Sequence, residues 1–221
     1  MTTNKDLIDA ARGAVPCDLN LANCSLVDLL RGEIRRGATV SIYRGFVVGI
    51  DDGLRAERTR DLKGMYLAPG LVDSHVHIES SMLTPPEYAR IVAPRGTTAI
   101  VADPHEIANV MGYEGMRYML AASEGLPLDV YLMVPSCVPA TDFDTAGAAL
   151  YASDMYPFLR EPRVLGLGEV MNYPGVLYKD QKLLDKIAIF RDAARPVDGH
   201  APGLSGGGLS AYVAAGIGSD H

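Results

Sequence analysis

The 221-residue sequence contains only three cysteines, Cys17, Cys24 and Cys137, with no Cys-x-x-Cys spacing among them. This odd and scattered set argues against a disulfide framework and against a cysteine zinc knuckle, and it is typical of a reducing compartment. No uninterrupted apolar run reaches about 18 residues, so no transmembrane helix is predicted. The N-terminus lacks the basic-then-apolar pattern of a secretory signal, and we therefore expect a cytoplasmic protein.

The sequence also lacks an excess of basic residues, with 20 Lys and Arg against 27 Asp and Glu. The formal net charge of −7 argues against nucleic acid or an anionic membrane as a partner, because both bind clusters of Lys and Arg. A hydrophobic content of 48% and a charged content of 21% are ordinary for a globular protein with a sizeable core. The length suits one large domain or two small ones.

The first third of the chain has a β pattern. After a helical leader at residues 1–17, we expect a small β domain at 18–68, in which turns such as Arg44-Gly45 separate the strands. The strands expected here are residues 25–28, 40–43, 46–50 and 61–67. A domain of this size is thin for an independent core, and nothing in it suggests chemistry.

From residue 69 to 221 the pattern changes to alternating strands and helices. Near-continuous apolar runs predict parallel strands buried on both faces, at residues 71–77, 97–103, 128–135, 164–170, 196–200 and 216–220. Helices are expected between them at residues 85–93, 106–123, 145–159, 181–194 and 205–215. Repeated βα units of this kind indicate either a doubly wound sheet or a (β/α) barrel.

All five histidines of the sequence fall at the C-terminal ends of these predicted strands. His75 and His77 end the first strand, His105 follows the second, His200 ends the fifth and His221 the sixth. In a barrel such strand ends converge on one mouth, whereas in a doubly wound sheet they spread along an edge. Convergence therefore favours the barrel.

The histidine pair at the end of the first strand indicates a metal site. Side chains alternate along a strand, so the imidazoles of His75 and His77 point to the same face. We expect them to bind a first metal ion, His200 and His221 to bind a second, and Glu169 to bridge the two. This donor set suits zinc, iron or manganese. A bound ion lowers the pKa of its water, which points to hydrolysis at a polar carbon centre.

The residues after the second strand, Asp103, His105 and Glu106, allow more than one interpretation. Asp103 precedes Pro104 at the start of a predicted helix and is either a helix cap or part of the site. His105 and Glu106 are candidates for substrate binding, for general acid/base catalysis or for metal ligation.

Five stretches of the sequence resemble the motifs of bacterial and archaeal adenine deaminases, within the amidohydrolase superfamily. His-Val-His-Ile-Glu-Ser-Ser-Met and Ala-Asp-Pro-His-Glu-Ile-Ala-Asn are the most specific of them. The stretches are residues 69–82, 97–112, 166–172, 198–204 and 219–221. The His-x-Glu and Pro-Cys-x-x-Cys signature of the other deaminase design is absent from the sequence. The resemblance implies a metal-dependent (β/α)₈ barrel beside a small β-sandwich, hydrolysing adenine to hypoxanthine and ammonia in purine salvage.

The resemblance also implies roles for individual residues. The metal-ligand positions of the family match His75, His77, Glu169, His200 and His221, with Mn²⁺ as the expected ion, Fe²⁺ or Zn²⁺ as alternatives, and a binuclear centre in the complete enzyme. The family's motif near the substrate matches Asp103, His105 and Glu106, which we predict to be catalytic. We expect a small purine as substrate and a homo-oligomeric assembly.

The sequence holds about six of the eight strand–helix units of a complete barrel. The acidic residue that ends strand eight in the superfamily is expected to be missing, so we predict an N-terminal part of the enzyme, weakly active or inactive alone. The predicted fold is thus α/β, an incomplete (β/α)₈ TIM-type barrel preceded by a small β-sandwich-like domain. The alternatives are another amidohydrolase acting on a cyclic amide or amidine, and a non-catalytic metal-binding fragment.

Overall fold

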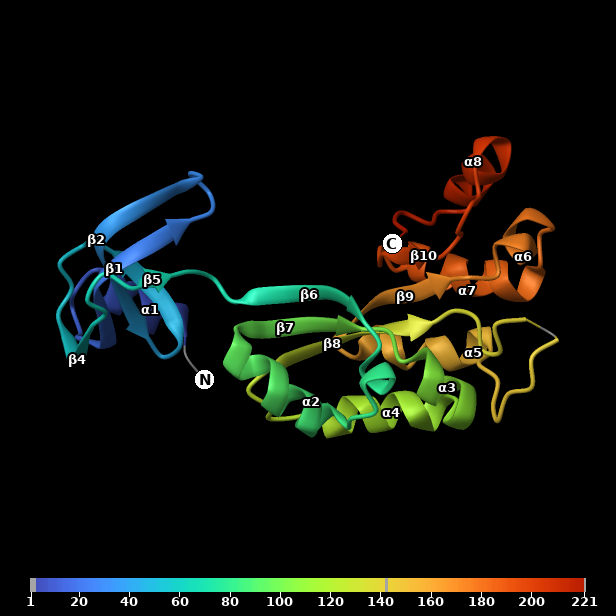
Figure 1. Ribbon diagram of the computed structural model, residues 1–221, viewed down its shortest axis with the longest axis horizontal. Helices are drawn as coiled ribbons and strands as arrows, with labels where there is room; N and C mark the ends of the chain where they lie inside the picture. Colours follow the sequence, from blue (N-terminus) through green and yellow to red (C-terminus); the bar gives the residue numbers. More distant parts are fainter. Residues whose placement is uncertain (1–2, 142, 221) are drawn as a thin grey trace. The chain divides into compact units, whose positions relative to one another are not determined.

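The computed structural model describes residues 3–141 and 143–220, and the chain forms two compact units, Met1–Pro69 and Gly70–His221 (Figure 1). Each unit has its own sheet. No helix among the described residues is long and apolar enough to cross a membrane.

The N-terminal unit is a helix followed by a mixed five-stranded sheet. Helix α1 (Asn4–Ala11) begins in a capping box formed by Thr3 and Asp6. In the sheet β1 pairs antiparallel with β2 and parallel with β4 and β5, and β2 pairs with β3. The strands are β1 (Cys17–Asp28), β2 (Glu33–Tyr43), β3 (Phe46–Ile50), β4 (Ala56–Asp61) and β5 (Tyr66–Leu67).

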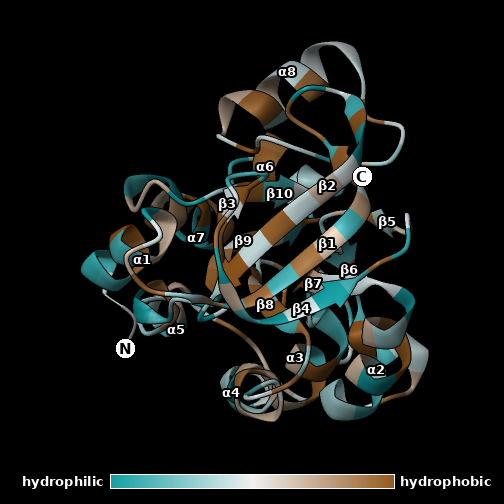
Figure 2. Cartoon of the chain, turned by 90° about the vertical axis from the view of Figure 1, so that its left-hand side faces the viewer, coloured by the Kyte–Doolittle hydropathy of each residue, from teal (hydrophilic) through white to brown (hydrophobic). Residues whose placement is uncertain are grey.

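The two-residue turn between β2 and β3 is the one that the sequence predicts. Arg44 and Gly45 have φ values of 48° and 83°, as tight hairpin turns require. The single strand predicted at residues 61–67 is wrong, because Lys63 and Gly64, with φ values of 50° and 81°, form a turn that separates β4 from β5. Strand β4 escapes prediction because it is mostly exposed and hydrophilic (Figure 2).

The C-terminal unit contains a curled, parallel half-barrel of five strands in the order β10-β9-β8-β7-β6. Two of its middle strands, β8 and β9, are mostly apolar and largely buried, as the sequence predicts for strands covered on both faces. Helices α2 (Pro85–Val92) and α4 (Tyr113–Ala122) run along one side of this sheet (Figure 1). The strands are β6 (Leu71–Val76), β7 (Thr97–Ala102), β8 (Asp129–Pro135), β9 (Val164–Val170) and β10 (Val197–Gly199).

Helical segments connect these strands and enclose one large core, in which Ile100, Leu167 and Phe190 are fully buried. The α-helices are α2 (Pro85–Val92), α3 (His105–Met111), α4 (Tyr113–Ala122), α5 (Ala152–Met155), α6 (Tyr173–Leu177), α7 (Gln181–Asp192) and α8 (Gly206–Ala214). Three short 3₁₀ turns are η1 (Ile78–Ser81), η2 (Ala93–Arg95) and η3 (Phe158–Arg160).

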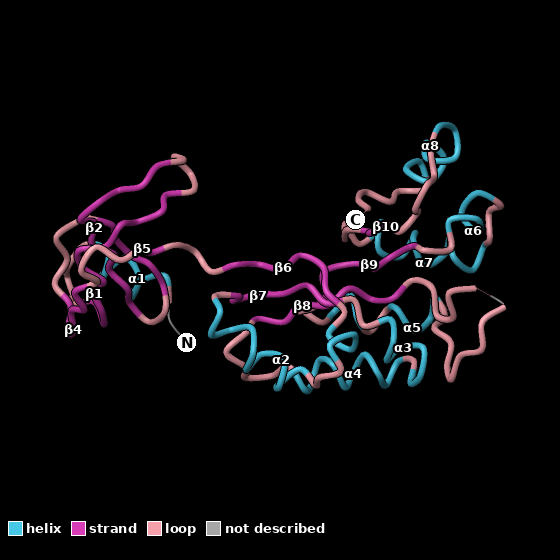
Figure 3. Tube along the Cα trace, viewed as in Figure 1, coloured by secondary structure: helices cyan, strands magenta, loops and turns pink. Residues whose placement is uncertain are grey.

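In the C-terminal unit, three predicted elements differ from the structure. The helix predicted at 106–123 is divided into α3 and α4 at Gly112, whose φ of 57° and ψ of −132° are not helical. Most of the helix predicted at 145–159 is loop (Figure 3), because the amides of Gly147 and Ala148 donate to the Asn109 carbonyl at 2.8 and 3.1 Å. The sixth strand is reduced, among the described residues, to one parallel bridge between Asp198 and Ser219.

Candidate metal centre

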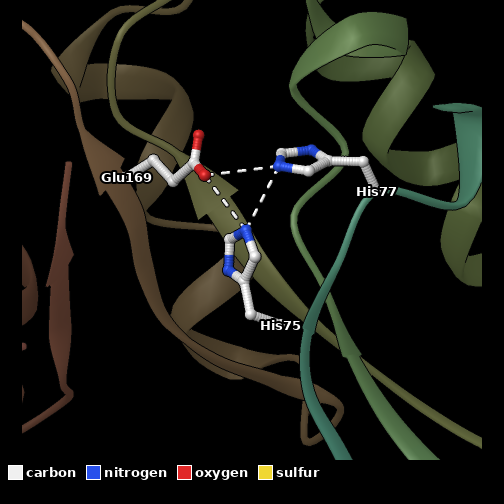
Figure 4. Close-up of side chains that lie close together, drawn as sticks. All are labelled: His75, His77 and Glu169. Carbon is white, nitrogen blue, oxygen red and sulfur yellow. Dashed lines mark hydrogen bonds and ion pairs between the residues drawn. The ribbon is translucent and has the colours of Figure 1, made fainter. Parts of the chain in front are cut away.

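The first two candidate ligands lie where β6 ends. His75 belongs to the strand and His77 follows Val76 directly, so strand alternation brings both imidazoles to the same face. Their Nε2 atoms are 3.2 Å apart, and the rings meet edge to face at 75° (Figure 4). The Asp103 amide donates to the Val76 carbonyl at 3.0 Å, which fixes the register between this strand end and the end of β7.

Glu169, near the end of β9, completes a three-residue cluster with this pair (Figure 4). The Oε1 atom of Glu169 lies 3.0 Å from His75 Nε2 and 3.3 Å from His77 Nε2. The Glu169 residue is 5% exposed, whereas both histidines are half-buried. Two imidazole nitrogens and one carboxylate oxygen therefore converge on a single point that remains open to solvent on the histidine side.

A second buried group shares Glu169. His105 Nδ1 lies 2.5 Å from Asp103 Oδ1 and 3.7 Å from Glu169 Oε2. Asp103 is therefore a partner of His105 and not a helix cap, since α3 starts after Pro104 without a side-chain cap. Gly168 makes this arrangement possible, because a Cβ at that position would lie 2.1 Å from Asp103 Oδ2.

Glu106 occupies the exposed edge of the site. Its Oε2 atom is 3.3 Å from His77 Nδ1, and its Oε1 atom accepts a hydrogen bond from the Ser80 hydroxyl at 3.2 Å. Nearby, Glu79 accepts a hydrogen bond from the Ile107 amide at 3.3 Å, which ties the segment after β6 to the first turn of α3. Burial raises the pKa of Glu79.

The charges of Glu169 and His77 are strongly coupled. Burial alone would raise the pKa of Glu169, but the hydrogen bond with His77 and the nearby imidazoles outweigh it and lower that pKa to about 2. The same hydrogen bond raises the pKa of His77 to about 9, against the opposing effect of burial. Burial also raises the pKa of Asp103, although His105 opposes the shift. The ionised form of Glu169 thus favours the protonated form of His77.

The structure brings most of the predicted site residues together. His200 lies somewhat further out, with Nδ1 4.0 Å from Glu169 Oε1. The prediction for His221 falls outside the described residues.

Tyr212 of α8 is not predicted from the sequence, yet its hydroxyl accepts a hydrogen bond from the His200 amide at 2.9 Å and donates one to the Val170 carbonyl at 2.6 Å. This hydroxyl clamp joins the ends of β9 and β10 through the Val170 carbonyl and the His200 amide. The sequence gives no signal for it, because a tyrosine in an apolar helix looks like an ordinary core residue.

This half-barrel with a histidine and carboxylate cluster at its strand ends is the architecture of a metal-dependent hydrolase. The model of the amidohydrolase family matches residues 66–221, and the chain belongs to that family, which is metal-dependent. The cluster of His75, His77 and Glu169 is a candidate for the family's metal site.

Several curated proteins are similar to almost the whole chain. An adenine deaminase of Desulfatibacillum aliphaticivorans is 53% identical over 215 residues, covering 97% of this chain and 37% of that protein. An adenine deaminase of Kosmotoga olearia is 49% identical over 217 residues, covering 98% of this chain and 37% of that protein. The chain therefore spans little more than a third of the length of these curated relatives.

Solved structures support the fold. An atrazine chlorohydrolase from Arthrobacter aurescens TC1, crystallised with zinc, aligns with a TM-score of 0.60 at 13% identity over 82% of this chain and 52% of that one. A prolidase complexed with N-methylphosphonate-L-proline aligns with a TM-score of 0.53 at 15% identity over 91% of this chain and 60% of that one.

Proposed function

We propose that this chain provides the metal centre of an adenine deaminase, which hydrolyses adenine to hypoxanthine and ammonia. The observation that carries the proposal is the convergence of His75, His77 and Glu169 at the strand ends of an amidohydrolase half-barrel. Identities near 50% to proteins named adenine deaminase, over nearly the whole chain, support adenine as the substrate.

The donor atoms suit a divalent ion. Nitrogen and oxygen ligands without a thiolate are the set that Mn²⁺, Fe²⁺ and Zn²⁺ accept, and we propose Mn²⁺. His75 Nε2, His77 Nε2 and Glu169 Oε1 would hold a first ion. Glu169 Oε2 and the Asp103–His105 pair offer donors for a second, with His200 and His221 as further proposed ligands. A bound ion of this kind supplies a water whose pKa is lowered toward neutrality.

Proton transfer is proposed for the residues around the ions. Hydrolysis of the adenine amidine consumes one water, and the departing amino group must gain a proton to leave as ammonia. Glu106 is half exposed and lies 3.3 Å from His77, so its carboxyl group can exchange protons with both solvent and a substrate at the mouth. Asp103 Oδ1 lies 2.5 Å from His105 Nδ1, which is also 3.7 Å from Glu169 Oε2, so Asp103 would orient the His105 ring beside Glu169 for acid/base catalysis.

We also propose a cytoplasmic location and a homo-oligomeric assembly. The cytoplasmic proposal is supported by three cysteines that are all buried and unpaired.

The proposal is tested by ammonia release from the native gene product, stripped of metal and reloaded with Mn²⁺. Adenine, cytosine and guanine are compared as substrates, with His75→Asn as the site variant and Gly207→Ala as a control with open space around the added methyl. We expect adenine to be the preferred substrate. Turnover should disappear in His75→Asn and should be unchanged in Gly207→Ala. Preference for another amine, or full activity of His75→Asn, would contradict the proposal.

A further inference from the structure

Ser136, the residue that follows β8, contacts the backbone of Glu169 from the neighbouring strand. It is completely buried, and its hydroxyl donates to the Glu169 carbonyl at 2.8 Å. Its own amide donates to the Gly168 carbonyl at 3.3 Å. Two hydrogen bonds from one residue thus hold the carbonyl groups of the two peptide bonds that flank the Cα atom of Glu169.

The backbone of Glu169 needs such support. Its φ of 20° is positive, a conformation that residues other than glycine seldom adopt. Its carbonyl also accepts from the Met171 amide at 2.6 Å, so the chain turns tightly just after the carboxylate-bearing residue. The direction of the Cα–Cβ bond is coupled to this backbone geometry. Any rotation of the peptide therefore re-aims a carboxylate that must reach His75 and His77 together.

Lys186 of α7 anchors Ser136 from the other side. Its ammonium group donates to the Ser136 carbonyl at 2.8 Å, and the residue is only 7% exposed. Burying an ammonium group is costly unless it is hydrogen-bonded, so this contact strongly favours one position for the Ser136 backbone. The hydrogen bonds therefore run from helix α7 through Ser136 to the Glu169 carbonyl.

We propose that Ser136 is a positioning residue for Glu169, supported by Lys186, and that it sets the orientation of the carboxylate between the two histidines and His105. This role rests on the proposed metal centre. Partners behind metal ligands commonly contribute about 10–100-fold to metal affinity, and we expect Ser136→Ala to weaken Mn²⁺ binding by roughly 10-fold.

The test compares the whole wild-type protein with Ser136→Ala and Ser123→Ala. Ser123 is a matched control, because it is 5% exposed and its hydroxyl has no hydrogen-bond partner among the described residues. Mn²⁺ dissociation constants are measured by equilibrium dialysis, and the visible absorption of the Co²⁺-loaded proteins reports the ligand geometry. We expect weaker Mn²⁺ binding and an altered Co²⁺ spectrum for Ser136→Ala only, with circular dichroism unchanged.

Wild-type affinity and an unchanged Co²⁺ spectrum in Ser136→Ala would overturn the positioning role. If Ser136→Ala does not fold, the positioning role is tested with Lys186→Met. This variant keeps an unbranched side chain of similar length and removes the donor to the Ser136 carbonyl. A changed Co²⁺ spectrum in Lys186→Met supports the role, and an unchanged spectrum overturns it. Failure of the wild-type protein to bind either ion would instead overturn the proposed metal centre, and the positioning role with it.

Discussion

Metal binding at His75, His77 and Glu169 is predicted to release a proton. The hydrogen bond with Glu169 raises the pKa of His77 to about 9, so the metal-free protein carries this imidazole in its protonated form near neutral pH. A metal ion binds only the neutral ring. At pH 7, two units below that pKa, about 1% of the molecules have a neutral His77, which weakens the apparent affinity about 100-fold. Glu169, with a pKa of about 2, is already ionised and releases no proton.

The assay is isothermal titration calorimetry with Mn²⁺ in buffers of different ionisation enthalpy, from pH 6.5 to 8.5. We expect about one proton released per ion bound at pH 7, and an affinity that falls about 10-fold for each unit of pH lowered. Glu106→Gln is an informative variant, because the Glu106 charge helps to raise the pKa of His77 and its removal should move the curve to lower pH. An affinity that is flat across this range, without proton release, would refute the coupling of His77 to Glu169.

Two further predictions concern stability. Tyr212→Phe removes the hydroxyl that joins the His200 amide to the Val170 carbonyl, so we expect urea denaturation to show a loss of about 1–2 kcal/mol, and unchanged stability would argue against the clamp. Gly168→Ala places a methyl 2.1 Å from Asp103 Oδ2 in a buried site, and thermal unfolding should show a loss of about 1–3 kcal/mol. Equal melting temperatures for Gly168→Ala and the wild type would contradict this steric argument.

The parallel strands of the half-barrel can be predicted from sequence, because long apolar runs bounded by turns have few alternatives in a two-sided sheet. Strands β7, β8 and β9 follow this rule. Strand β4 does not, since an exposed edge strand of charged residues carries no hydrophobic pattern. The loop at residues 145–151 has a helical composition, but tertiary hydrogen bonds to Asn109 compete with helix formation and prevail.

Some residues of the candidate site can likewise be predicted from the sequence, and others cannot. Strand alternation and the convergence of strand ends are enough to predict that His75, His77 and Glu169 lie together. The sequence gives no signal for Ser136 or Tyr212, whose contacts act on backbone groups of other strands. Such contacts depend on the packing of elements that are distant in sequence, and no local pattern records them. The roles assigned to the site residues stay predictions until metal binding is measured.

His75, His77 and Glu169 are proposed to bind one metal ion together. The most direct measurement is anomalous X-ray diffraction from crystals of the Mn²⁺-loaded protein. We predict a strong manganese peak roughly 2–2.3 Å from His75 Nε2, His77 Nε2 and Glu169 Oε1. Crystals in which these three atoms remain in direct contact without a peak between them, or in which manganese binds elsewhere, would contradict the claim.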